Sequence, residues 1–262
     1  MTERATILGA EIAYEVIGDG LAFIWGHGLS QSRVAESVFG LIDFDRLPGQ
    51  IVRYDARGHG ESESTPDLPG YGWDQLALDQ LALADHLGID RYISAGASMG
   101  CGTALHAAVS APNRVARCVL VIPPTAWETR ATQAGEWQRI ATMIEHDGVE
   151  PTIAARAAQP LPDPLADDAH VRDRQAAATR AWDPTRLAHV MRGAGHADFP
   201  TRDQVAAITA PTLILAWTGD PVHPDTTAHQ LHELLPDSVL HVASTSSELS
   251  TWTSLVADFV SS

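Results

Sequence analysis

The chain contains no lysine, and this absence excludes several kinds of chemistry. Its 17 basic residues are all arginine, against 33 acidic residues. Schiff-base catalysis, a pyridoxal-phosphate linkage and a P-loop phosphate grip all need an ammonium group. The formal net charge of −16 also disfavours a surface for DNA, RNA or anionic lipid, because such surfaces need clustered positive charge. We therefore expect a small-molecule substrate, with no nucleic-acid or membrane partner; the sequence leaves the oligomeric state open.

Cysteines and long apolar runs are also scarce. The two cysteines, Cys101 and Cys118, are too few for a disulfide framework or a zinc ribbon, so we expect buried free thiols. The first 20 residues lack a basic segment followed by an apolar run, and no stretch reaches the roughly 18 apolar residues of a membrane span. These features predict a cytoplasmic location.

Short apolar runs alternate with helical patterns along most of the chain. Residues 5–20 alternate apolar and polar side chains around a glycine turn, which predicts a β-hairpin. Six further runs end in glycine or a turn and predict buried strands: 21–28, 50–60, 91–100, 114–124, 211–221 and 238–244. The stretch between the second and third of these runs, 73–88, has leucines at helical spacing. The pattern predicts an α/β fold with a mainly parallel eight-stranded sheet flanked by helices.

The alternation stops after Pro123. Residues 124–199 carry helical patterns and no convincing strand, with a proline-rich joint at 158–168. We interpret this segment as an inserted helical cap, so that residues 1–123 and 200–262 form the core.

A glycine-spaced turn follows the run at 91–97. It reads Gly96-Ala97-Ser98-Met99-Gly100 and has the G-x-S-x-G spacing of a nucleophile elbow, which exposes a serine at a helix N-terminus. The same glycines also fit a dinucleotide-binding loop. That alternative is disfavoured because the loop lies in mid-chain, no lysine is present and the next predicted strand does not end in an acid.

Three further stretches match a known arrangement around such a serine: "WGHGLSQS" at 25–32, "YDARGHGES" at 54–62 and "LAWTGDPVHP" at 215–224. With the elbow, they occur in the order found in the α/β-hydrolase superfamily, which the chain resembles over nearly its whole length. The resemblance implies a nucleophile, Ser98, and an acid, Asp220, because Pro123 and Pro124 occupy the alternative acid position. It also implies a helical cap.

The resemblance carries two further implications for the loops near the serine. The backbone amides of Leu29 and Met99 are expected to form an oxyanion hole. Asp55 and His59 belong to the loop that is structural in the family.

The chain departs from the family pattern where the catalytic histidine is normally found. The loop after the last predicted strand contains Ser246, Ser247 and Glu248 instead, and a carboxylate is a poor acceptor for a serine proton. Among the twelve histidines, His223 lies three residues after Asp220, between two prolines. We hypothesise that His223 is the general base; the alternatives are that it is a turn residue, or that His189 or His196 overhangs the site.

The leading interpretation is a cofactor-free serine hydrolase that needs no metal and acts on an ester, lactone or related acyl bond of a small to medium-sized molecule. Two alternatives remain: a ligand-binding protein that has lost its base, and a lyase or cyclase that uses the same oxyanion hole. Candidate substrate-binding side chains, which would otherwise be ordinary core residues, are His27, Trp127, Trp137, Met143, Trp182 and Trp217.

Overall fold

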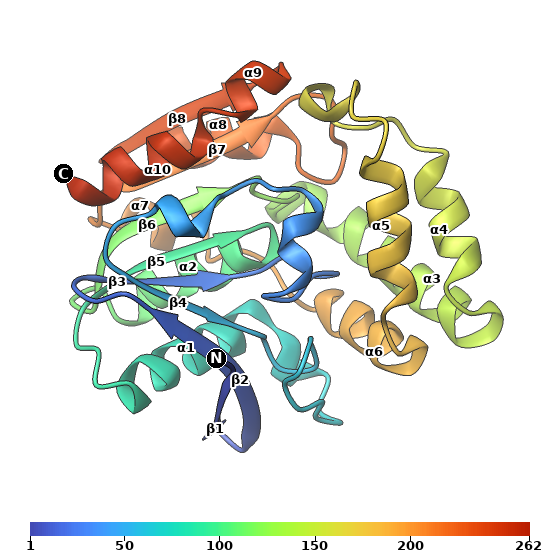
Figure 1. Ribbon diagram of the computed structural model, residues 1–262, viewed down its shortest axis with the longest axis horizontal. Helices are drawn as coiled ribbons and strands as arrows, with labels where there is room; N and C mark the ends of the chain where they lie inside the picture. Colours follow the sequence, from blue (N-terminus) through green and yellow to red (C-terminus); the bar gives the residue numbers. More distant parts are fainter.

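A single eight-stranded sheet organises the molecule. The computed structural model describes residues 1–262, except for the side chains of residues 37 and 38. The strand order across the sheet is β1-β2-β4-β3-β5-β6-β7-β8 (Figure 1). Its strands are β1 (Glu3–Ile7), β2 (Ala10–Ile17), β3 (Ala22–Gly26), β4 (Gln50–Tyr54), β5 (Tyr92–Ala97), β6 (Val115–Val121), β7 (Thr212–Trp217) and β8 (Ser238–Ala243). The predicted eight-stranded sheet is confirmed.

The sheet is antiparallel at one edge and parallel elsewhere. Strand β2 pairs antiparallel with β1, to which a tight turn joins it, and also with β4. The pairings from β4 to β8 are parallel. The carboxyl ends of β3, β5, β6 and β7 therefore lie along one edge. Strand β7 lies two places from β5, so the loops after these strands are close enough for their side chains to meet.

Helices cover both faces of the sheet because the buried strands alternate their side chains between two cores. Ile24 and Leu120 point into the core shared with α1, α2 and α8, whereas Phe23 and Val119 point into the core shared with α10. The outer helices are α1 (Trp73–His86), α2 (Met99–Ser110), α7 (Arg202–Ala206), α8 (Asp225–Leu234), α9 (Ser246–Leu249) and α10 (Trp252–Ser261), with short 3-10 turns η1 (Ala35–Val38), η2 (Phe44–Arg46) and η3 (Pro69–Tyr71).

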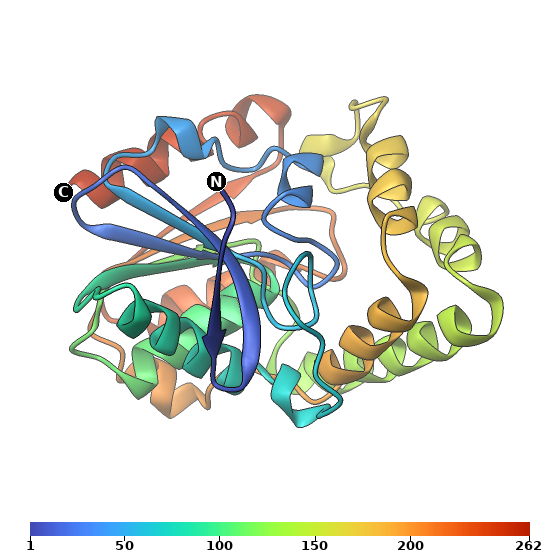
Figure 2. The same ribbon diagram turned by 60° about the horizontal axis from the view of Figure 1, so that its bottom comes forward.

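The segment between β6 and α7 is helical and lies beyond the sheet in both views (Figures 1 and 2). It contains η4 (Trp127–Thr129), α3 (Arg130–Asp147), α4 (Glu150–Ala157), η5 (Asp163–Leu165), α5 (Val171–Arg180) and α6 (Pro184–Ala194). Helices α3 and α6 share a small core that includes Ile144 and Leu187. No strand occurs between 124 and 199 within the described backbone. The division into core and cap at these residues stays a prediction.

The two cysteines behave as predicted from their scarcity. Cys101 and Cys118 are buried and free. None of the described helices combines the length and the apolar character that crossing a membrane requires.

Candidate active site

Ser98 lies at the sharp turn between β5 and α2. Its backbone has φ 52° and ψ −108°, a conformation that non-glycine residues rarely adopt. Backbone segments pack very closely here: a Cβ on Gly96 would lie 2.6 Å from the Cα of Gly100, and one on Gly100 would lie 2.0 Å from the carbonyl oxygen of Gly26. Glycines at these positions therefore allow the strained turn that places Ser98 at the N-terminus of α2.

The loop after β7, residues 218–224, brings an acid and an imidazole to this serine; we call it the β7 loop. The His223 Nε2 lies 2.9 Å from the Ser98 hydroxyl oxygen, and its Nδ1 lies 2.7 Å from Asp220 Oδ2. Since a carboxylate can only accept, Nδ1 carries the proton in the neutral ring and Nε2 is free to accept from the Ser98 hydroxyl. The structure thus brings together the three residues named from the sequence.

Asp220 shapes the β7 loop as well as orienting the imidazole. Its Oδ1 accepts hydrogen bonds from the backbone amides of Val222 (2.9 Å) and His223 (3.3 Å), which closes a tight turn. Its Oδ2 accepts from the indole nitrogen of Trp217 at 3.1 Å. Backbone amides at one oxygen and the Trp217 indole at the other therefore hold the carboxylate in place, in addition to its contact with the His223 ring.

The electrostatic surroundings keep Asp220 ionised. Burial by itself would raise the pKa of this carboxyl, but the His223 ring and the amides of Val222 and His223 outweigh burial and lower the pKa below its ordinary value. A permanently negative Asp220 can stabilise positive charge on the neighbouring imidazole.

The loop after β8, where the family normally has its catalytic histidine, contains a capped helix instead. It forms α9, and Glu248 caps that helix by accepting hydrogen bonds from the amides of Ser244 (2.7 Å) and Thr245 (3.0 Å). The hydroxyl oxygen of Thr245 accepts a hydrogen bond from the Glu248 amide in return. The carboxylate of Glu248 is thus committed to helix capping rather than to Ser98.

The two residues expected to form the oxyanion hole lie near Ser98. Leu29 and Met99 both line the pocket in front of Ser98, and neither of their amides donates a hydrogen bond to any described residue. The amide of Met99 is also the first of α2, where the helix dipole favours negative charge. The oxyanion hole expected from these two amides stays a prediction.

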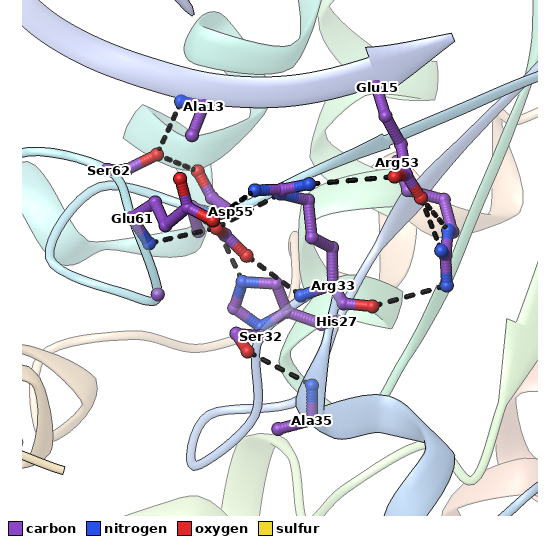
Figure 3. A network of polar contacts seen from close by, with 12 residues as sticks. Ala13, Glu15, His27, Ser32, Arg33, Ala35, Arg53, Asp55, Glu61 and Ser62 are labelled. Carbon is purple, nitrogen blue, oxygen red and sulfur yellow. Dashed lines mark hydrogen bonds and ion pairs between the residues drawn. The ribbon is translucent and has the colours of Figure 1, made fainter. Parts of the chain in front are cut away.

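A buried network follows β4 and supports the loop that carries Leu29 (Figure 3). In this β4 loop, residues 55–63, Asp55 accepts from the backbone amide of Arg33 (2.8 Å) and from its Nε (3.2 Å). The Asp55 side chain is 1% exposed, so it neutralises a buried guanidinium. Figure 3 also shows Arg33 and Arg53 sharing Glu15.

His59 in the β4 loop contacts backbone rather than the serine. Its Nε2 lies 2.8 Å from the carbonyl oxygen of Leu29 and its Nδ1 lies 2.9 Å from that of Arg57. Burial, and after it the neighbouring His27 ring, lower the pKa of His59 to about 3. The ring is therefore neutral, so it donates to one of the two carbonyls only, and it fixes the backbone around Leu29.

A small, nearly closed pocket lies in front of Ser98, with a cavity volume of about 20 Å³. Its lining comes from the core and from the helical segment: Leu29, Trp73, Ser98, Met99, Pro124, Arg130, Trp137, Ala194 and Val222. Ligand sites are typically about 300–1,000 Å³ in volume, so this cavity is far smaller than most of them.

Of the six side chains expected to bind substrate, the structure brings only Trp137 to this pocket. His27 is fully buried: its Nδ1 faces the Gly28 carbonyl and its Nε2 accepts from the Ala56 amide. It therefore braces the backbone near Leu29. Trp217 is 2% exposed and donates to Asp220, so it supports the acid instead of contacting substrate.

The other three side chains of the helical segment are also elsewhere, which corrects the expectation that they line the pocket. Trp127 donates to the Pro200 carbonyl and packs beside Phe199. Met143 lies in a groove on the outer surface of α3. Trp182 donates to the Ser30 carbonyl. Apolar composition identified the segment, but the helical spacing in α3 did not reveal which side faces Ser98.

The sequence analysis missed two prominent residues of the pocket, Trp73 and Arg130. Both begin helices, and neither belongs to a motif. The one signal available in the sequence was a charged residue, Arg130, six positions after Pro124, near the predicted end of a buried strand. No group of three or more His, Cys, Asp or Glu side chains in the described part of the chain is arranged to hold a metal ion.

Comparisons with known proteins agree with this geometry. A family profile described as "alpha/beta hydrolase fold" matches residues 27–253. The 3-oxoadipate enol-lactonase 2 of Acinetobacter baylyi is 31% identical over 193 residues, which cover 73% of this chain and 69% of that protein. The N-formylmaleamate deformylase of Pseudomonas putida is 47% identical over 70 residues, 27% of this chain and 26% of that protein.

Solved structures superpose over the whole length. A hydrolase from Pseudomonas aeruginosa has a TM-score of 0.83 at 25% identity, covering 100% of this chain and 98% of its own. The enol-lactonase from Burkholderia xenovorans has a TM-score of 0.82 at 22% identity, covering 99% of this chain and 100% of its own. The second likeness concerns the fold alone.

Proposed function

Because the chain belongs to the alpha/beta-hydrolase family and is a hydrolase, we propose that Ser98, His223 and Asp220 form its catalytic triad. The reaction is hydrolysis of an ester or lactone bond in a compact organic molecule. The relatives named enol-lactonase support this substrate class. The observation that carries the proposal is the continuous chain of contacts from Asp220 through the His223 ring to the Ser98 hydroxyl, at 2.7 and 2.9 Å.

In the first half-reaction, the Ser98 oxygen attacks the substrate carbonyl while its proton passes to His223 Nε2. The C=O electron pair moves to oxygen, and the amides of Leu29 and Met99 stabilise the negative charge. When the tetrahedral intermediate collapses, the bond to the leaving alkoxide or enolate breaks. That oxygen takes the proton from His223, which leaves an ester on Ser98; with a lactone, both ends of the opened ring stay in one molecule.

In the second half-reaction, water replaces the leaving group. His223 removes a proton from the water as it attacks the acyl-enzyme, and it returns the proton to Ser98 when the acid product departs. Asp220 stays ionised throughout, so it stabilises the positive ring in both steps without accepting the proton. No cofactor takes part in this scheme.

The base in this scheme comes from the acid's own loop, which explains how the chain dispenses with a histidine in the loop after β8. The order along the chain is Ser98, Asp220, His223. Only two residues lie between acid and base, so the turn closed by Asp220 fixes their relative position directly.

Labelling with a fluorophosphonate tests the proposal. The expected result is one phosphonyl adduct, located at Ser98 by peptide mass analysis and absent from Ser98→Ala. An unactivated hydroxyl reacts very slowly, so failure of the folded protein to label would favour a ligand-binding protein without a base. Product analysis on an ester or lactone substrate would reveal a lyase or cyclase, because only hydrolysis adds water.

A further inference from the structure

The pocket in front of Ser98 contains a buried cation. Arg130, at the start of α3, is 5% exposed and lines the same pocket as Ser98. Its Nε donates to the Ala197 carbonyl at 2.6 Å and its Nη2 to the Ala194 carbonyl at 2.8 Å. These two bonds fix the plane of the guanidinium within the helical segment.

The charge of Arg130 has no counterion close to it. No carboxylate of a described residue forms an ion pair with this guanidinium, and its Nη1 has no hydrogen-bond acceptor among those residues. The Trp73 ring lies under it, with the guanidinium carbon 4.3 Å from the ring centroid. Burial lowers the pKa of Arg130 to about 10, partly opposed by Asp198, so the group stays charged at neutral pH.

Asp198 does not neutralise the cation directly. Its Oδ1 accepts from the backbone amides of Trp127 (3.0 Å) and Phe199 (2.7 Å). Its influence on Arg130 is therefore that of a charge at a distance. A buried cation without a paired anion is unfavourable, which calls for an anionic group that arrives from outside.

Two further donors line the same pocket. The indole N–H groups of Trp73 and Trp137 are both buried, and neither finds a hydrogen-bond acceptor in the described protein. Unsatisfied buried donors are rare in folded proteins, and here two of them belong to residues that line one pocket together with a guanidinium that has no counterion. The surroundings of Ser98 are thus rich in donors and poor in acceptors.

From these donors we propose that Arg130, Trp73 and Trp137 form an anion subsite, and that the substrate carries a carboxylate in addition to the bond that is cleaved. The inference rests on the proposed function for the position of that bond. One guanidinium edge and two planar N–H donors match a singly charged, planar carboxylate better than a dianionic phosphate.

The test separates binding from catalysis. Calorimetry with Ser98→Ala, which cannot turn over, compares monomethyl glutarate with its neutral isostere methyl 4-carbamoylbutanoate. We expect the acid to bind about 10- to 100-fold more tightly than the amide, as for hydrogen bonds to charged groups. Arg130→Met in the same background should remove this preference, while the affinity for the amide stays the same.

Two matched variants protect the test against misfolding. Arg139→Met lies on the same helix, but its guanidinium is exposed and pairs with Glu136, so the preference for the acid should persist. Trp137→Phe keeps an aromatic side chain, although a smaller one, and removes the indole N–H, so it should weaken acid binding several-fold. It replaces Arg130→Met in the test if that variant does not fold. Equal affinities for acid and amide, or binding of neither at millimolar concentration, would overturn the subsite.

Hydrolysis by the wild-type protein is measured in parallel with the mono-p-nitrophenyl ester of glutaric acid and with p-nitrophenyl 4-carbamoylbutanoate. Faster cleavage of the acid, with loss of that preference in Arg130→Met, supports both proposals. Cleavage of both esters at equal rates, without selective binding, overturns the subsite and leaves the triad intact. Selective binding without Ser98-dependent hydrolysis overturns the triad and leaves the subsite intact.

Discussion

Two loops near Ser98 each carry an aspartate followed closely by a histidine, yet they are built for different tasks. In the β4 loop, Asp55 is 1% exposed and neutralises Arg33, and His59 faces backbone carbonyls. In the β7 loop, the acid contacts the histidine itself, and that histidine reaches a hydroxyl, with side-chain exposures of 12% and 16%. The same residue types therefore give a scaffold or a reactive group according to their partners and their burial.

Replacing His223 by Ala should have the largest effect. If His223 is the general base, kcat/KM for a p-nitrophenyl ester should fall by about 10³- to 10⁴-fold, because Ser98 loses its proton acceptor. The urea midpoint should change little, since the ring is partly exposed. His229→Ala, on the exposed side of α8, is the control and should keep full activity. A loss of less than tenfold in His223→Ala would show that the β7 loop is not catalytic.

Replacing Asp55 by Asn should affect stability instead. The free energy of unfolding should fall by about 3 kcal/mol, because the buried Arg33 loses its buried counterion. Arg33 keeps Glu61 at 2.8 Å, which limits the loss. Urea unfolding gives the stability, and fluorophosphonate titration gives the activity per folded molecule, which should stay within about tenfold of wild type. Full stability with a large loss of activity would assign the β4 loop a catalytic task.

Replacing Asp220 by Asn is the counterpart in the β7 loop. The amide can still accept from the backbone, but it carries no charge to stabilise the imidazolium, so kcat should fall by about 10²-fold. Asp225→Asn, in the first turn of α8, is the matched control and should leave kcat unchanged. If Asp220→Asn lowered the urea midpoint and left kcat intact, Asp220 would resemble Asp55 and the contrast between the loops would fail.

The contrast also shows how far the sequence could predict the site. The G-x-S-x-G spacing predicted the elbow because a side chain on either glycine would collide with neighbouring backbone. Asp220 and His223 are close in the sequence, which predicted that one loop carries both. The β5-β6-β7 strand order allows that loop to reach Ser98. The orientation of the His223 ring, by contrast, depends on hydrogen bonds from the backbone amides of Val222 and His223 to Asp220. No sequence spacing specifies these bonds.

Substrate-facing residues were harder to predict for a physical reason. The packing of the whole segment 124–199 decides which side of a helix faces Ser98. Local sequence periodicity does not specify such long-range packing. Met143 and Trp137 lie on the same helix, yet only Trp137 reaches the pocket. Arg130 was overlooked because a charged residue is normally exposed, and only the structure reveals its burial.

The smallest predicted effect is the contribution of His27 to the pH dependence of the free energy of unfolding. His27, which braces the β4 loop, is buried and accepts from the Ala56 amide, and burial lowers its pKa. Below pH 6.5 the unfolded chain gains a proton that the folded ring does not, so stability should fall as pH falls, by up to about 1.4 kcal/mol per unit for this group. In His27→Gln, urea unfolding should show a shallower slope between pH 6.5 and about 5, whereas the two proteins should have parallel slopes above pH 7, where histidine is neutral in the unfolded chain. Identical slopes in the acid range would mean that His27 takes up a proton in the folded protein, and a titrating histidine would then support the β4 loop.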